Sequence, residues 1–143
     1  MTISMAKFTL SFEEEYPYLV FGITATTKDY RMCWSLNKAL NISLKRQSAV
    51  DIHDKEKGIT GHSFFVYEDE MYSAKYRLIE NKRAHSRFLP EVVQADYLLI
   101  VDETERISKT EILLKIKTIR QVLLAFNIDI DTLKHKQNLM LTA

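Results

Sequence analysis

Two carboxylates near a proline are the residues whose types are best suited to chemistry in this chain. Glu91 follows Pro90, and Asp96 stands shortly after it, directly before Tyr97. Two carboxyl groups in one cleft could act as a general acid and base, or could bind a hard cation. The alternative is structural: the carboxylates accept backbone N–H groups or pair with a cation such as Arg31 or Arg87, while Pro90 rigidifies the backbone. We favour the structural role.

A second group of candidates lies on a helix predicted over residues 28–41, with Thr27 as its expected N-cap. An apolar stripe at helical spacing runs along it, formed by Tyr30, Cys33, Leu36 and Leu40. Asn37 falls inside this stripe and must find hydrogen-bond partners, either by orienting a ligand or by bonding a neighbouring segment. We favour the internal bond. Tyr30 and Trp34 could anchor a partner, although aromatic residues at this spacing more often belong to the core.

Basic residues gather on a third segment and raise the alternative of nucleic-acid binding. Lys75 and Arg77 share the polar face of a strand predicted over residues 71–81, and Lys82, Arg83 and Arg87 belong to a basic loop that follows it. Cations beside aromatic residues such as Phe65 or Tyr67 could stack the bases of a single strand. However, the net charge is only +1 and no RNA-binding signature is present. A solvated face, or one covered by a second subunit, fits better.

The sequence lacks the familiar signatures of catalysis and cofactor binding. The histidines, His53, His62, His85 and His135, fall in predicted loops without the spacing of metal ligands. The single cysteine, Cys33, lies on the inward stripe of the predicted helix, where a thiol is inert packing. No serine-hydrolase elbow, phosphate-binding loop or dinucleotide fingerprint is found. We therefore expect no metal and no cofactor, and enzymatic activity is the less favoured alternative.

The remaining pattern predicts one α+β domain over residues 1–143, with a mainly antiparallel sheet of about five to six strands and two packed helices. Lys7–Phe12 alternates like a half-buried strand, paired as a hairpin with residues 18–25. Further strands are expected over residues 44–52, 63–68 and 71–81, with a loop over 53–61. The continuous apolar run 97–101 predicts a central strand.

The strongest local signal is a capping box, in which Ser108 is the N-cap and Glu111 the third helical residue. Ile107 and Ile112 form the accompanying hydrophobic staple. We expect this second helix to run from Lys109 to about Phe126. Residues 129–143 are expected to form a short helical turn and then a partly ordered extension.

Bulk properties narrow the class of protein. The chain has 143 residues, with 20 basic against 19 acidic side chains, which argues against a dedicated nucleic-acid or membrane-surface protein. The start of the sequence does not resemble a signal peptide, and the longest apolar run is too short to span a bilayer. The expected location is the cytoplasm.

The segment Leu89–Tyr97 resembles the signature of the bacterial IPExxxVDY family. Pro90, Glu91, Asp96 and Tyr97 match that motif, while Leu89 replaces its isoleucine and Ala95 its valine. Residues 28–37 also resemble the first helix of this family, and the length agrees over nearly the whole chain. The resemblance implies a small cytoplasmic protein without an assigned activity, and its motif carries no established chemistry.

Together these features predict a non-enzymatic binding or interaction module whose partner is another protein or a second copy of the chain. The reason is an apparent surplus of aromatic surface, with Tyr18, Trp34, Phe65 and Tyr67 as its members. The alternatives are a nucleic-acid-associated protein that uses the basic set, and a small enzyme that uses Glu91 and Asp96. No membrane partner is expected.

Overall fold

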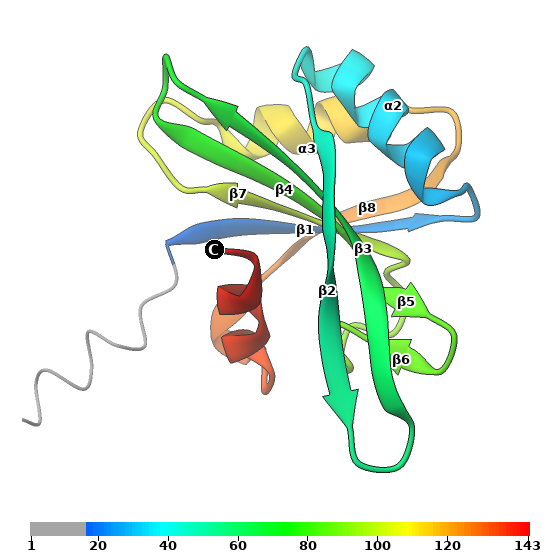
Figure 1. Cartoon of the computed structure of the whole chain (residues 1–143). Coiled ribbons are helices and arrows are strands. Elements are labelled where there is room, and N and C mark those ends of the chain that lie inside the picture. The colour runs from blue at the N-terminus through cyan, green and yellow to red at the C-terminus, as the bar shows by residue number, and fades with distance from the viewer. Residues whose placement is uncertain (1–16) are drawn as a thin grey trace, which may run out of the picture.

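The computed structural model describes residues 17–143. In this part of the chain, one twisted antiparallel sheet carries two α-helices on one face and the C-terminal segment on the other (Figure 1). The α+β class predicted from the sequence is thereby confirmed. The strand expected at Lys7–Phe12, and with it the hairpin to residues 18–25, lies outside the described residues.

The sheet has six strands in the order β2-β3-β4-β7-β1-β8. Their bounds are β1 Tyr18–Ala25, β2 Lys45–Asp54, β3 Gly58–Asp69, β4 Ala74–Glu80, β7 Tyr97–Asp102 and β8 Val122–Ile128. A separate two-stranded hairpin is formed by β5 Lys82–Arg83 and β6 Ser86–Arg87. The helices are α2 Asp29–Leu40 and α3 Lys109–Lys117, followed after β8 by the 3-10 helices η1 Ile130–Thr132 and η2 Lys136–Thr142.

Strand β7 is the centre of the sheet, as its apolar run predicted. It pairs with β4 on one side and β1 on the other, and Tyr97–Val101 are all buried. Alternate side chains enter two separate cores, with Leu99 facing the helices and Leu98 facing the C-terminal segment. A strand covered on both faces has no polar side, which explains the unbroken apolar sequence.

Helix α2 forms where expected, but its buried face is rotated relative to the prediction. The N-cap is Lys28 rather than Thr27, and it makes no side-chain capping bond. The helix buries Met32, Cys33, Ser35 and Leu36, whereas Tyr30 is 55% exposed. The predicted stripe was therefore wrong at Tyr30, because the helix turns Met32 toward the sheet instead.

Helix α3 begins at the predicted capping box and ends earlier than predicted. The Ser108 hydroxyl accepts a hydrogen bond from the Glu111 N–H at 3.2 Å, and Ile107 and Ile112 pack in the same core. Its continuation to Phe126 was wrong, because residues 122–128 leave the helix and pair with β1 as strand β8. The backbone hydrogen bonds along β1 outweigh the local helical pattern.

Strands β2 and β3 form a long hairpin that extends beyond the rest of the sheet (Figure 1). The loop predicted over residues 53–61 was wrong, because β2 continues to Asp54 and β3 begins at Gly58. Gly58 lies at a φ of +83°, a conformation that suits the tight turn. The predicted basic loop is likewise the β5–β6 hairpin, and the strand expected from residue 71 begins at Ala74.

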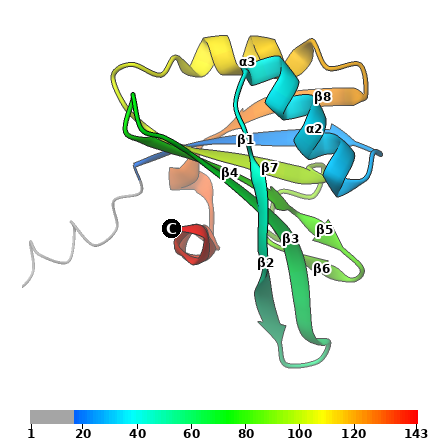
Figure 2. The same ribbon diagram turned by 45° about the horizontal axis from the view of Figure 1, so that its top comes forward.

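The C-terminal segment packs against the face of the sheet opposite the helices, as Figure 2 shows. Leu133, Leu139 and Thr142 are buried there. Residues 129–143, for which a short helical turn and a partly ordered extension were expected, form η1 and η2, and Leu133 and Leu139 pack in the second core. No helix among residues 17–143 is long and apolar enough to cross a membrane.

Candidate functional site

Glu91 fastens the C-terminal segment to the rest of the protein. Its carboxylate accepts hydrogen bonds from the Lys134 N–H, from the His135 N–H at 2.8 Å and from the His135 ring Nδ1 at 3.0 Å. Burial raises the pKa of Glu91, but the backbone and ring hydrogen bonds outweigh it and hold that pKa below its ordinary value. Glu91 is thus an ionised clamp whose partners are two backbone N–H groups and the His135 ring, rather than the expected Arg31 or Arg87.

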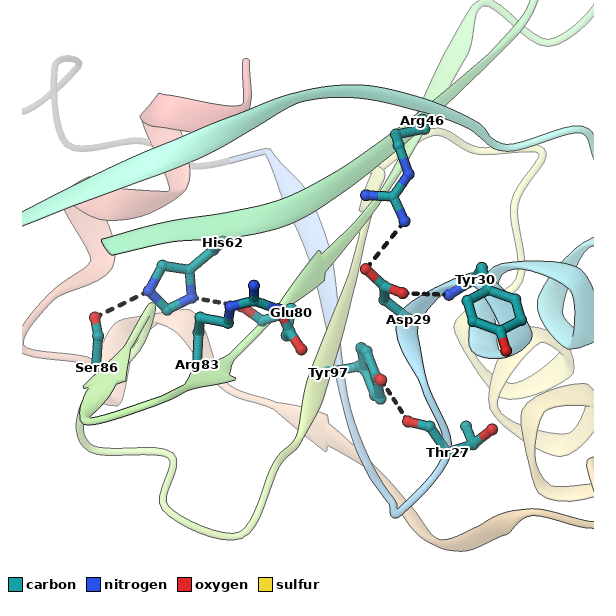
Figure 3. A network of polar contacts seen from close by, with 9 residues as sticks. All are labelled: Thr27, Asp29, Tyr30, Arg46, His62, Glu80, Arg83, Ser86 and Tyr97. Carbon is teal, nitrogen blue, oxygen red and sulfur yellow. Dashed lines mark hydrogen bonds and ion pairs between the residues drawn. The ribbon is translucent and has the colours of Figure 1, made fainter. Parts of the chain in front are cut away.

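Asp96 and Tyr97 fasten a different part of the fold. The Asp96 carboxylate accepts the Ala25 N–H at 2.8 Å at the end of β1, and its other oxygen lies 3.6 Å from the Lys82 ammonium. The Tyr97 hydroxyl donates to the Thr27 carbonyl at 2.5 Å (Figure 3). Burial raises the pKa of Tyr97 well above its ordinary value, so the hydroxyl stays a donor. Glu91 and Asp96 therefore hold different segments of the fold, as the structural role favoured from the sequence anticipates.

Asn37 makes the internal bonds favoured from the sequence. Its side-chain oxygen accepts the Leu44 N–H at 2.7 Å, and its amide donates to the Leu44 carbonyl at 3.2 Å. These bonds hold the turn between α2 and β2. Trp34, in contrast, is 64% exposed, so it contributes to the surface and not to the core.

The basic residues proposed for nucleic-acid contact do not form an open face. Arg77 is only 4% exposed: its Nε donates to the Thr142 carbonyl at 2.8 Å, and its guanidinium lies 3.0 Å from the Asp102 carboxylate. Lys82 pairs with Asp96, and Arg83 lies 3.4 Å from Glu80. The face that carries Lys75 and Arg77 was expected to be solvated or covered by a second subunit, and at Arg77 it is covered by the chain's own C-terminal segment.

A serine–histidine pair, missed in the sequence, joins the β5–β6 hairpin to β3. His62 is fully buried, its Nδ1 lies 2.7 Å from the Glu80 carbonyl oxygen, and its Nε2 lies 2.9 Å from the Ser86 hydroxyl (Figure 3). A carbonyl oxygen can only accept, so Nδ1 carries the hydrogen. Burial lowers the pKa of His62, against the Glu80 hydrogen bond that raises it, so the ring is neutral near pH 7. Nε2 is then the acceptor, and the Ser86 hydroxyl donates to it.

Ser86 lies on the wall of a cavity of about 450 Å³, here called the hairpin pocket. The pocket is also lined by Lys57, Arg87, Pro90 and His135. Pro90, from the segment Leu89–Tyr97, thus lines the pocket directly, and Glu91 bonds to His135, another lining residue. In the described part of the chain, no group of three or more His, Cys, Asp or Glu side chains could hold a metal ion.

Asn81 shapes the approach to this pocket. This buried side chain donates to the Val92 carbonyl at 3.0 Å and to the Ala95 carbonyl at 2.9 Å, and it accepts the Leu89 N–H at 2.8 Å. All but one of its bonding positions are therefore used to fix the loop that contains Pro90. Nothing in the polar stretch 80–83 distinguished Asn81 for this role in the sequence.

Strand β8 forms a second candidate surface at an edge of the sheet. Among the described residues its one strand neighbour is β1. Leu123 is 72% exposed and Leu124 is also exposed. Next to the start of β8, Trp34 and Lys38 from α2 line a groove together with Ile119 and Arg120. Of the aromatic residues expected to form a surplus, Trp34 is exposed, Tyr18 and Tyr67 are partly buried, and Phe65 is buried in the core.

Comparison with known proteins finds no matching model of a protein family and no matching curated protein. The resemblance of Leu89–Tyr97 to the IPExxxVDY family stays a prediction.

Proposed function

We propose that this chain is an interaction module that binds a second copy of itself through the edge of β8. The observation that carries the proposal is the composition of that strand. Val122–Ile128 contains no charged residue and no proline, and it presents Leu123 and Leu124 to solvent. Natural edge strands are usually protected by charge, proline or a covering segment, because exposed edges invite pairing with another chain.

The opposite edge of the same sheet supports this assignment by contrast. Strand β2 carries Lys45, Arg46, Asp51 and Asp54, and most of its residues are exposed. Charges of this kind discourage pairing with a further strand. Only one of the two edge strands in the described sheet therefore has the composition of an interface.

A second copy is the partner that fits β8 best. In a two-fold antiparallel pairing each strand meets an identical strand, so a charged residue would be placed close to its own kind. Strand β8 avoids this repulsion because it has no charge. The groove beside Trp34 continues from the start of β8 and offers an aromatic anchor for the same contact.

The test is the molar mass of the protein in solution, measured by light scattering and by sedimentation equilibrium over a series of concentrations. We expect a dimer at micromolar concentration and a monomer for Leu123→Lys, because lysine on the edge is a typical barrier to strand pairing. Met71→Lys is the matched control: Met71 is 77% exposed on a turn far from β8 in the sheet order, and this variant should stay dimeric.

Two results would overturn the proposal. One is a wild-type monomer throughout the micromolar range. The other is a dimer that tolerates both Leu123→Lys and Trp34→Ala, which would place the contact elsewhere on the surface.

A further inference from the structure

The serine–histidine pair has the geometry of a nucleophile and its base. The Ser86 hydroxyl donates to a neutral imidazole at 2.9 Å, and the Glu80 carbonyl at 2.7 Å fixes the ring in the tautomer that leaves Nε2 ready to accept a proton. A nucleophile, a base within hydrogen-bond reach and a third group that orients the base are the three parts that nucleophilic catalysis needs. Here the third part is a main-chain carbonyl instead of a carboxylate.

We propose that Ser86 is the nucleophile of an acyl-transfer site that hydrolyses esters of small carboxylic acids, with His62 as its general base. The Ser86 oxygen forms a bond to the ester carbonyl carbon while His62 Nε2 takes the hydroxyl proton. The C–O bond to the alcohol then breaks, and the proton passes from His62 to the departing alcohol. Water attacks the acyl-serine with His62 again as base, which releases the carboxylic acid and restores the Ser86 hydroxyl.

The hairpin pocket gives this pair access to a substrate. Ser86 is one of the residues that line it and is 9% exposed, whereas His62 is fully buried and does not line it. The volume of about 450 Å³ lies within the usual range for small-molecule sites. A small acyl group fits such a space.

Positive charge is available beside the nucleophile. The Lys57 ammonium is held 2.9 Å from the carbonyl oxygen of His85, the residue directly before Ser86, and Arg87 directly after it also lines the pocket. A cation near the attacked carbonyl stabilises the oxyanion that forms on it. Asp51 and Asp54 also line the pocket, so this stabilisation comes from the cations next to Ser86 and not from the net charge of the pocket.

The turn that precedes Ser86 has a left-handed backbone, as two-residue hairpin turns usually require. Ala84 occupies the turn of the β5–β6 hairpin at a φ of +52°, in the left-handed region. This conformation costs an alanine about 1–2 kcal/mol, and glycine would avoid the cost. Strain of this kind gathers at functional sites, where the surrounding fold enforces a side-chain position.

The competing role is structural, with the pair acting only as a link between the hairpin and β3. The two roles differ in reactivity, so the experiment measures covalent labelling. The folded wild-type protein is incubated with a fluorophosphonate, which phosphonylates activated serines, and is analysed by intact-mass and peptide mass spectrometry. We expect one adduct per chain, on Ser86, and a labelling rate that falls as the pH is lowered and His62 becomes protonated.

Variants of Ser86 and His62 test the role of each residue. Ser86→Ala should abolish the adduct and the hydrolysis of p-nitrophenyl acetate above the background of the buffer. His62→Gln should slow both by about 10²–10⁴-fold, the usual contribution of a general base. Ser35→Ala is the matched control, since Ser35 and Ser86 are both 9% exposed, and it should label like the wild type.

The proposal is overturned if the folded wild-type protein gives no adduct, if the adduct lies on another residue, or if His62→Gln labels at the wild-type rate. Should His62→Gln fail to fold, the pH profile of wild-type labelling decides instead, and a rate that does not fall on acidification at any pH at which the protein stays folded would reject His62 as the base. None of these outcomes depends on the self-association proposed above.

Discussion

Replacing Glu91 by glutamine removes the charge of the clamp on the C-terminal segment and keeps its shape. The wild-type carboxylate accepts three hydrogen bonds from two consecutive residues, Lys134 and His135. Glutamine retains one acceptor oxygen and places an amide donor where the second oxygen stood. The amide oxygen can keep the two backbone bonds and the amide can donate to His135 Nδ1 in its other tautomer, so the change removes the charge of the acceptor rather than the contacts.

The expected cost is about 1–2 kcal/mol of unfolding free energy. A hydrogen bond to a charged group contributes about 1.5–3 kcal/mol, and the lower end applies because the Glu91 and His135 side chains are 23% and 45% exposed. The segment should stay docked, since burial of Leu133 and Leu139 stabilises it by about 1.5–3 kcal/mol for each leucine. Leu139→Ala should accordingly cost more, about 2–5 kcal/mol.

The contribution of Glu91 also has a definite pH dependence. Its pKa is lower in the folded protein than the ordinary value of 4.5. The stabilisation is therefore fully present above about pH 4.5 and is lost as the pH falls through the folded pKa. Glu91→Gln should differ most from the wild type near neutral pH, and the two should converge in acid.

Urea denaturation at pH 7 and at acid pH measures both effects, and hydrogen exchange of residues 133–142 reports on the segment itself. Glu105→Gln is the control, because Glu105 is an exposed residue of the loop before α3. A Glu91→Gln variant that matches Glu105→Gln in stability, with unchanged exchange in the segment, would refute the clamp.

Three further predictions concern the pair, the hairpin and the sheet. Burial holds the folded pKa of His62 below its ordinary value of 6.5, so the unfolded chain binds the proton more readily and stability should fall as the pH drops below about 6.5. His62→Gln should flatten this part of the plot of urea midpoint against pH. An equally steep plot for the variant would contradict the prediction. Ala84→Gly should raise the unfolding free energy by about 0.5–1 kcal/mol, measured by thermal denaturation, because glycine accepts the positive φ; a loss of stability would show that Ala84 is unstrained. Gly22→Ala should lower the unfolding free energy by about 1–3 kcal/mol, since the new Cβ would lie 2.4 Å from the Phe126 ring. The loss should be smaller in a Phe126→Ala background, and equal losses in both backgrounds would reject the contact.

Local signals in the sequence predicted the elements that depend on local physics. The run Tyr97–Val101 was assigned to a central strand because its residues are apolar without alternation, and the strand is buried on both faces. Ser108 and Glu111 located the start of α3, since a capping bond involves residues one turn apart. Asn37 was expected to bond internally, and it does so through Leu44, which is close in the chain.

The predictions that failed depend on partners distant in the sequence. Nothing between Lys117 and Val122 marks the change from helix to strand, and β8 exists because β1 offers it hydrogen bonds. The charged stretch around Asp54 resembled a loop because the β2–β3 hairpin is largely exposed there and requires no apolar face. His62 and Ser86 meet only when the β5–β6 hairpin folds against β3, so no spacing in the sequence indicated the pair.

The place of β1 in the sheet sets an order for folding. Strands β2, β3 and β4 pair with their neighbours in the chain, whereas β1 joins Tyr18 to Asp102 and Val20 to Ile128, across most of the sequence. Closing such large loops costs chain entropy before any contact repays it, and folding slows as contact order rises. We therefore expect the β2–β4 meander to form early and the first and last strands to close the sheet in the rate-limiting step. Until β1 joins the sheet, β7 is paired only with β4 and its other edge has no strand partner in the described sheet.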